Sequence, residues 1–256
     1  MSIQEQCDFR NEMIGDRNKY DGIECSKCLN RGFIHVVNAY DEIVHEDCIC
    51  KSQRKIALTI KKSGLEDNFK RYTMDNYNIT QPFQQDIKTK ALKFIKEHSK
   101  KNALGNVIEQ WFYISGQVGS GKSHICTAIA SELIKQGYDF KYLDFAHEMS
   151  RLTTELRSGY PDVREKTEKE FDYLCNVKVL YIDDFMKTSD DKHLFDLINS
   201  RYGKNNLITI ISSEKVFDKH EIGYEGLPSR IYERCGQEYY ITLGKDINKN
   251  YRLGDK

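Results

Sequence analysis

The stretch WFYISGQVGSGKS, residues 111–123, decides the fold of this chain. Its first five residues predict a buried strand, and the next eight match the pattern G-x-x-x-x-G-K-[ST] at every fixed position. Residues 123–136 then predict a helix, so the pattern lies between a strand and a helix, as a phosphate-binding loop requires. The alternative is a glycine-rich turn that carries a lysine by chance, and the strand–loop–helix context argues against it.

A loop of this kind binds the phosphates of Mg-ATP. Its glycines let backbone N–H groups turn inward around the β-phosphate, and the N-terminus of the following helix adds the positive end of its dipole. Lys122 is expected to reach the β- and γ-phosphates, and Ser123 to place its hydroxyl on Mg²⁺. The predicted nucleotide-binding residues are Gly116, Gln117, Val118, Gly119, Ser120, Gly121, Lys122, Ser123 and His124.

Two acidic residues end a second apolar stretch, VKVLYIDDF, at residues 177–185. A near-continuous apolar run of this kind is typical of a buried parallel strand. Asp183 would then bind Mg²⁺, directly or through water, and Asp184 could act as a general base that orients the attacking water. Strands often end in acids for solubility alone, so this pattern gains its weight from the phosphate-binding loop upstream.

Strands and helices alternate through the rest of the chain. This alternation predicts an α/β fold, with a parallel sheet and helices on both of its faces. The expected helices of this region include residues 146–158, 164–174, 190–202 and 227–235. The five expected strands are residues 111–115, 139–145, 177–185, 207–212 and 238–243.

Four cysteines in two close pairs precede this region. Cys25 and Cys28 form one pair, Cys48 and Cys50 the other, and the segment between the pairs is a plausible hairpin. Paired thiols at this spacing predict a structural tetrahedral zinc site, and a metal would stabilise a segment too small for a core of its own. Free buried thiols or a redox pair are the alternatives. His35 and His45 are possible substitute ligands.

Composition limits what the protein can be. The chain has 256 residues, and its 39 Lys and Arg balance its 39 Asp and Glu, so any contact with nucleic acid must use a local patch. The N-terminus carries acids and no apolar core of a signal peptide, and no apolar run approaches the length of a membrane span. These features predict a cytoplasmic protein with no membrane association, whose cysteines stay reduced unless they bind metal.

The chain resembles a known group of ATPases. The motifs GQVGSGKSH (116–124), VLYIDDF (179–185), LITIISSE (207–214) and LPSRIYERC (227–235) are similar to those of AAA+ helicase loaders of the DnaC/DnaI type. The ATPase part also resembles the IstB transposition helpers. The resemblance covers residues 65–245, and it implies an AAA+ P-loop NTPase with a five-stranded parallel sheet.

The resemblance also implies roles for three further residues. Ser213 follows a strand that looks like the AAA+ sensor strand, although such loaders often have Asn at its tip. The segment from Ser229 to Arg234 looks like the one that holds an arginine finger, for which Arg234 is the first choice and Arg230 the second. The alternative is that both arginines form surface ion pairs on one helix face.

Two departures from the AAA+ pattern have consequences. Many such enzymes have Glu where this chain has Asp184, so we expect slow basal hydrolysis that a partner stimulates. About a dozen residues follow the last expected strand, which leaves no room for a large C-terminal lid. Closure over the nucleotide would then come from a neighbouring subunit, so we expect self-association on ATP binding.

The resemblance assigns partners to two expected domains. Residues 1–62 would form a zinc-binding domain with a basic helix that contacts a hexameric replicative helicase of the DnaB type, and residues 63–256 the AAA+ ATPase. Single-stranded DNA would lie along basic residues of the helical region after the second strand, although acidic neighbours balance them. Residues 63–83 suit an ordered linker. The resemblance implies that Phe69, Tyr72 and Met74 of this linker pack on adenine, and the alternative is that they fill the core.

The function expected from these features is an ATP-dependent helicase loader in DNA replication. The closest rival is an IstB-like transposition helper, which shares the ATPase core but is not expected to carry the four cysteines. A DnaA-like initiator would need a duplex-binding domain after the last strand, and a small-molecule kinase would need a lid and an acceptor pocket.

Overall fold

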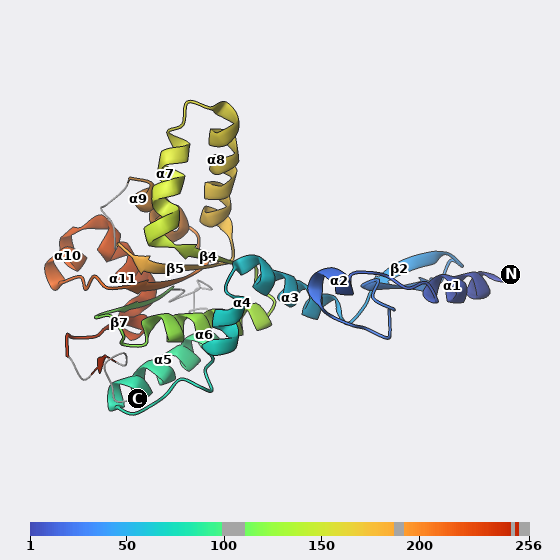
Figure 1. Cartoon of the computed structure of the whole chain (residues 1–256), viewed down its shortest axis with the longest axis horizontal. Helices are drawn as coiled ribbons and strands as arrows, with labels where there is room; N and C mark the ends of the chain where they lie inside the picture. The colour runs from blue at the N-terminus through green and yellow to red at the C-terminus, as the bar shows by residue number, and fades with distance from the viewer. Residues whose placement is uncertain (99–110, 187–191, 247–248, 251–256) are drawn as a thin grey trace. The chain divides into compact units, whose positions relative to one another are not determined.

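A computed structural model describes residues 1–98, 111–186, 192–246 and 249–250 of the chain (Figure 1). The chain divides into two compact units, residues 1–66 and residues 67–256, and each is described by itself.

The first unit is a small hairpin with three helices. Its strands pair antiparallel with His35 opposite His45, as predicted for the segment between the cysteine pairs. The Arg31 guanidinium ties the N-terminal helix to this hairpin, because it donates to the carbonyl oxygens of Arg10 and Asn11. The elements of this unit are α1 (Ile3–Asn11), α2 (Asn18–Asp21), β1 (Phe33–Val37), β2 (Ile43–Asp47) and α3 (Lys51–Ser63).

The second unit is built on a five-stranded sheet in which every neighbouring pair is parallel. The strand order is β4-β5-β6-β3-β7, so the strand that leads into the phosphate-binding loop lies between the last strand and the strand of residues 208–213. The prediction of a five-stranded parallel sheet is therefore confirmed. The strands are β3 (Trp111–Ser115), β4 (Phe140–Asp144), β5 (Val179–Phe185), β6 (Ile208–Ser213) and β7 (Tyr240–Thr242).

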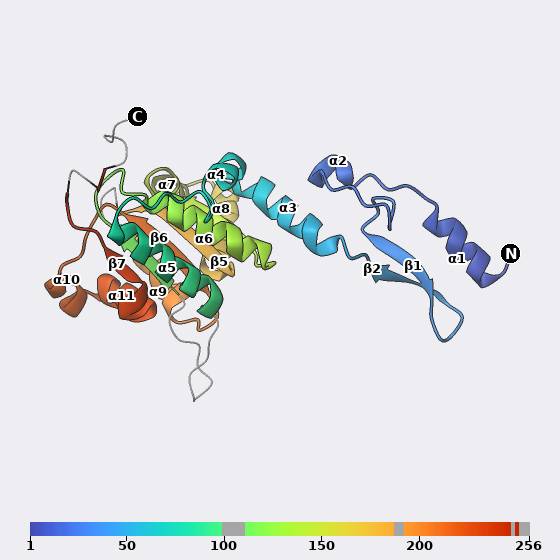
Figure 2. The same ribbon diagram turned by 90° about the horizontal axis from the view of Figure 1, so that it is seen from below.

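Helices cover the sheet and extend from it. The helix after the phosphate-binding loop, α6, packs on β5 and β6, and α5 lies beside it (Figure 2). The paired helices α7 and α8 project from the sheet (Figure 1). No helix in the described ranges is long and apolar enough to cross a bilayer. These elements are α5 (Pro82–Glu97), α6 (Lys122–Lys135), η1 (Phe145–Met149, a π-helix), α7 (Ser150–Leu156), α8 (Pro161–Asn176), α9 (Lys192–Tyr202), α10 (Lys219–Tyr224) and α11 (Gly226–Tyr239).

One helix lies where the sequence predicted a linker. Residues 63–83 contain turn-forming residues, yet the structure has a short helix, α4 (Glu66–Arg71), within them. The Phe69 ring is buried and lies 5.8 Å from the ring of Phe140, centroid to centroid. Burial of this aromatic ring stabilises a turn of helix that local propensity alone does not favour.

A buried arginine, Arg201, connects α9 to the end of α8 and to β6. Arg201 of α9 is fully buried and donates to four oxygens, those of Leu174 O, Val177 O, Ile208 O and Thr209 Oγ1. Burial lowers the pKa of this guanidinium to about 9. Because each of its nitrogens has a hydrogen-bond acceptor, Arg201 fixes the end of α8 against β6 through backbone and hydroxyl oxygens.

Candidate nucleotide-binding site and four-thiol cluster

The backbone of residues 116–121 adopts conformations that favour glycine. Gly116 has φ of 147°, and a Cβ there would lie 2.7 Å from Leu243 Cβ, which is too close for any side chain. Gly121, at the start of α6, has φ of 84°. The loop thus presents bare backbone at the N-terminus of a 14-residue helix, where amide groups and the helix dipole favour an anion.

Lys122 lies at the mouth of this loop. Its side chain is buried, and Nζ donates to the carbonyl oxygens of Gly116 at 2.9 Å and Gln117 at 2.7 Å. Burial lowers the pKa of Lys122, and the carboxylates of Glu214 and Asp184 oppose that effect. The ammonium is therefore held by loop carbonyls and flanked by carboxylates, at the position from which it would contact phosphate oxygens.

The Asp183 carboxylate is fixed by hydroxyl donors from three elements. Ser123 Oγ lies 3.3 Å from Oδ1, Tyr142 donates to Oδ2 at 3.2 Å, and the Ser212 hydroxyl also donates to Oδ1. Burial raises the pKa of Tyr142, and the nearby Asp183 charge raises it further, so this phenol stays a donor. Ser123 and Asp183 thus lie together as Mg²⁺ requires, with a hydroxyl and a carboxylate oxygen as hard ligands.

A β-bulge in β5 sets the backbone conformation of Asp184, the second of the two adjacent acids. Ile182 pairs with Ile211 and Phe185 with Ser213, so β5 has one more residue than β6 across this interval. Asp184 takes the left-handed conformation, with φ of 53°, and its N–H donates to Asp183 Oδ1 at 3.1 Å. For a residue with a side chain this conformation costs on the order of 1 kcal/mol. Bulges often re-aim side chains beside active sites.

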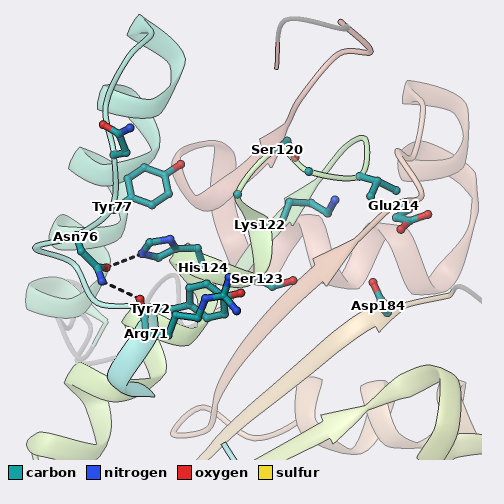
Figure 3. A pocket seen from close by; sticks show the side chains of 14 residues that line it. Arg71, Tyr72, Asn76, Tyr77, Ser120, Lys122, Ser123, His124, Asp184 and Glu214 are labelled. Atoms are coloured by element: carbon teal, nitrogen blue, oxygen red, sulfur yellow. Dashed lines mark hydrogen bonds between the residues drawn. The ribbon is translucent and has the colours of Figure 1, made fainter. Parts of the chain in front are cut away.

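Residues 118–124 and Asp184 line a cavity of about 400 Å³, whereas Gly116, Gln117 and Asp183 are not among its lining residues (Figure 3). One wall comes from the segment after α4, which packs on α6 through His124. The Nε2 atom of His124 lies 3.0 Å from Thr73 O and 3.1 Å from Asn76 Oδ1, and since both partners are oxygens it carries the proton. The lining residues are Arg71, Tyr72, Asn76, Tyr77, Asn78, Val118, Gly119, Ser120, Gly121, Lys122, Ser123, His124, Asp184 and Glu214.

Of the three residues predicted to pack on adenine, only Tyr72 lines the cavity. Phe69 and Met74 are buried side chains, so for them the packing interpretation fits the structure. The sequence reasoning missed Arg71, Asn76, Tyr77, Asn78 and Glu214. Spacing alone does not indicate which face of a linker turns toward the loop.

The predicted sensor and finger residues lie elsewhere. Ser213 is buried, and its hydroxyl donates to Phe185 O at 2.7 Å; its neighbour Ser212 is the one that contacts Asp183. Arg234 donates to Tyr202 O and Lys204 O, and Arg230 donates to Gly226 O of its own helix. Neither arginine is among the residues that line the cavity of its own chain.

The basic residues expected to contact DNA are largely paired with acids on the α7–α8 arm. Arg151 contacts both Glu155 and Glu170, and Arg164 lies 3.5 Å from Glu168. Lys169 pairs with Glu165 one turn away. Surface pairs of this kind balance charge and contribute little to stability.

The four predicted zinc ligands come together in the first unit. The Sγ atoms of Cys25, Cys28, Cys48 and Cys50 all lie within 4.8 Å of one another. The distance is 3.8 Å from Cys25 to Cys48 and 3.6 Å from Cys28 to Cys50. Zn–S bonds of about 2.3 Å in a tetrahedron place sulfurs about 3.8 Å apart, so the geometry of the thiols fits zinc.

A buried arginine supports this cluster. Arg54 Nε donates to Cys50 Sγ at 3.3 Å, while its Nη1 contacts both carboxylate oxygens of Asp21 at 2.7 and 2.8 Å. Its other nitrogen contacts Asn30, whose side chain accepts from the Cys25 N–H. A thiolate set carries negative charge, and the Arg54 guanidinium lies beside it, as outer-sphere partners of metal ligands do.

Residues 31–234 match the family described as IstB-like ATP binding protein. The chain belongs to this family. This match makes it an ATP-binding protein, its five-stranded parallel sheet is the one that the resemblance to AAA+ proteins predicted, and a four-cysteine group near its N-terminus could hold zinc.

Known proteins similar to this IstB-like chain include two from Bacillus subtilis strain 168. YqaM is 30% identical over 224 residues, which cover 82% of this chain and 67% of YqaM. The phage-like element PBSX protein XkdC is 26% identical over 249 residues, covering 93% of this chain and 88% of XkdC. The replicative helicase loader DnaC of Escherichia coli K12 is 26% identical over 145 residues, or 57% of this chain and 55% of DnaC.

A solved structure agrees on the fold. A putative primosome component from Streptococcus pyogenes serotype M3 superimposes with a TM-score of 0.50 at 19% identity, covering 70% of this chain and 88% of its own. A likeness at this identity shows the fold alone. By its sequence, the IstB-like chain is also related to the DnaC helicase loaders, as the resemblance in its motifs predicted.

Proposed function

We propose that this protein is an ATP-dependent helicase loader in DNA replication, in which the bound nucleotide controls binding to a hexameric helicase. The observation that carries the proposal is the joining, in one chain, of a phosphate-loop cavity and a four-thiol unit with its own elements. The likeness to the loader DnaC supports it. The first unit would bind the helicase, and the second would bind ATP and single-stranded DNA.

The residues of the cavity would divide the work on ATP. The loop amides and Lys122 would hold the phosphates, and Ser123 with Asp183 would hold Mg²⁺, which supplies charge neutralisation on the β- and γ-phosphates. Asp184 would face the attacking water. Among the described residues that line the cavity, the one arginine is Arg71, which lies against the Tyr72 ring, so a neighbouring subunit would supply the finger.

Arg230 and Arg234 are the candidates for that finger. Arg234 would have to give up bonds to Tyr202 O, Lys204 O and Asn205 Oδ1. Arg230 would give up a bond within its own helix, to Gly226 O. Arg230 would therefore lose fewer hydrogen bonds than Arg234 on turning toward a neighbouring subunit, which makes it at least an equal candidate for the arginine finger.

The test is binding to a purified replicative helicase and to single-stranded DNA, with and without a slowly hydrolysed ATP analogue. We expect helicase binding to require intact thiols, so Cys28→Ser abolishes it, while Lys122→Ala keeps it but loses ATP-dependent DNA binding. A wild-type protein that binds nucleotide and zinc yet binds no helicase would overturn the proposal.

An IstB-like transposition helper is the second candidate, because the family match is to that group. It would bind duplex DNA in the presence of ATP and stimulate a transposase. Preference for a duplex over a single strand of the same sequence, together with transposase stimulation, would favour it over the loader.

A further inference from the structure

Glu214 is a carboxylate that lines the cavity and has no role in the arrangement described so far. It follows directly after β6 and lines the cavity with Asp184, which lies near the carboxyl end of β5 (Figure 3). Both side chains lie near the Lys122 ammonium, and among the carboxylates that raise the pKa of Lys122 the effect of Glu214 is the largest. Glu214 therefore lies close to the charge that would contact the γ-phosphate.

Sheet order explains this position. β6 is the direct neighbour of β3, whereas β5 is one strand further away. Ser213 pairs with Ser115, and the N–H of Gly116 donates to Ser213 O at 3.1 Å. The residue after Ser213 must therefore emerge beside the first residues of the phosphate-binding loop, since the carboxyl ends of parallel strands share one edge.

The other two acids are more restricted. The Asp183 carboxylate accepts hydroxyl groups from Ser123, Tyr142 and Ser212, which suits it for a metal. Asp184 is directed by the bulge, and its side chain is one methylene shorter than that of Glu214. Glu214 is exposed and has the longer reach, so it can approach a water molecule at the open side of a bound γ-phosphate.

We propose that Glu214 is a catalytic residue that orients the attacking water and accepts its proton. The water oxygen bonds to the γ-phosphorus, and the bond from phosphorus to the β–γ bridging oxygen breaks, leaving its electron pair on ADP. One water proton passes to the Glu214 carboxylate and from there to solvent, so ATP and water yield ADP, phosphate and a proton. This assignment rests on the proposed ATPase activity.

The experiment compares Glu214→Gln with Asp184→Asn in single-turnover hydrolysis at saturating Mg-ATP, with nucleotide affinity measured on the same samples. Loss of a positioned general base lowers the rate by about 100-fold or more. We expect that loss for Glu214→Gln, a smaller loss for Asp184→Asn, and an ATP Kd within threefold of wild type for both. Glu132→Gln, which removes a surface carboxylate paired with Lys135 on α6, serves as the matched control.

The outcomes separate this assignment from the proposed function. A Glu214→Gln rate within threefold of wild type, in a protein that still hydrolyses ATP, overturns the role of Glu214 and leaves the ATPase intact. A wild-type protein that binds ATP but never hydrolyses it, even with helicase and DNA present, overturns the proposed activity itself. Partial rescue of the rate in Glu214→Asp would support a carboxylate that acts on water, because a purely structural role would not follow proton-accepting ability.

Discussion

The two units of this chain are stabilised in different ways. The ATPase unit, residues 67–256, buries whole strands, and all five side chains of β3 are buried in its sheet. In the thiol unit, residues 1–66, the buried cluster consists of Cys28, Cys48 and Cys50, and Cys25 and Ile34 pack against it. Burial of apolar surface stabilises the ATPase unit by roughly 25 cal/mol per Å². The thiol unit is small, and a metal held by its four cysteines would supply stability that a core of its own cannot. A four-thiol metal site would therefore take the place of a second apolar core in residues 1–66.

Removing one thiol gives the largest expected effect and tests this comparison most directly. We expect Cys28→Ser to lose zinc and unfold the thiol unit, because structural zinc contributes about 10–16 kcal/mol of apparent binding free energy. ATP affinity should stay within twofold of wild type. Metal analysis, limited proteolysis and nucleotide titration measure the three quantities.

The control for that variant is Cys7→Ser. Cys7 is buried in α1 of the same unit but lies outside the four-thiol group, so zinc content should stay at one per chain. One equivalent of zinc in Cys28→Ser would contradict the tetrahedral site.

The converse change affects the ATPase unit alone. Lys122→Ala removes the ammonium at the mouth of the loop, and charge-assisted bonds to two phosphates are worth about 3 kcal/mol or more together, or roughly 100-fold in affinity. Zinc content should not change. Fluorescent nucleotide titration measures the loss, and Lys135→Ala, which breaks a surface pair on the same helix, should bind ATP normally. Equal affinity in Lys122→Ala and wild type would refute the phosphate site.

A sharper test of the thiol unit targets the arginine beside the metal ligands. Arg54→Met removes the donor to Cys50 Sγ and leaves Asp21 buried without its partner. Loss of such an outer-sphere partner typically weakens metal binding 10- to 100-fold. Competition with a zinc chelator measures the change. Lys62→Ala, an exposed basic residue of the same helix, should retain wild-type affinity, and an unchanged Arg54→Met would show that the guanidinium is dispensable.

The smallest expected effect is a pH dependence in the cavity wall. Burial lowers the pKa of His124, so its neutral form is favoured when residues 72–77 pack on α6. Above the ordinary His pKa of 6.5 both packed and open states are neutral, and no effect is expected. As the pH falls below that value, the open state takes up the proton first and packing weakens.

We therefore expect ATP affinity to fall by about three- to tenfold between pH 7.5 and 5.5, beyond any change seen in His124→Gln. The variant keeps a side-chain donor and lacks the titrating ring, so it corrects for protonation of the nucleotide. Lys88 is the nearby cation that adds to the lowering of the His124 pKa. Parallel curves for the two proteins would contradict a role for His124.

The phosphate-binding loop, the strand that carries Asp183 and the cysteine pairs could be predicted because each has a recognisable pattern in a short stretch of sequence. The strand–loop–helix at residues 111–136 appears as predicted, and the strand predicted for residues 177–185 appears as β5 with Asp183 in it. The paired cysteines meet because each pair lies in or beside a tight turn, and the hairpin brings the two pairs together. Periodicity and spacing report such features directly.

The choice among adjacent polar residues on one strand did not follow from pattern. Side chains alternate across a strand, so Ser212 and Ser213 point to opposite sides. The sequence favoured Ser213 as the sensor, but the structure turns its hydroxyl to Phe185 O and brings Ser212 to Asp183. Which side faces the phosphate loop depends on sheet order and on the bulge in β5, and neither can be read from residues 207–214 alone.

The sequence by itself determined that this chain has a phosphate-binding loop, acids at the end of a buried strand, a parallel sheet and four thiols in a metal-binding pattern, because each has a signature that can be read along the chain: a strand–loop–helix motif, an apolar run, an alternation of strands and helices, and two close cysteine pairs. Only the tertiary structure decided that Arg54 supports the thiols, that His124 anchors residues 72–77, and that Glu214 enters the cavity. Those contacts join segments far apart in the chain, and they form only when strand order and helix packing bring the segments together.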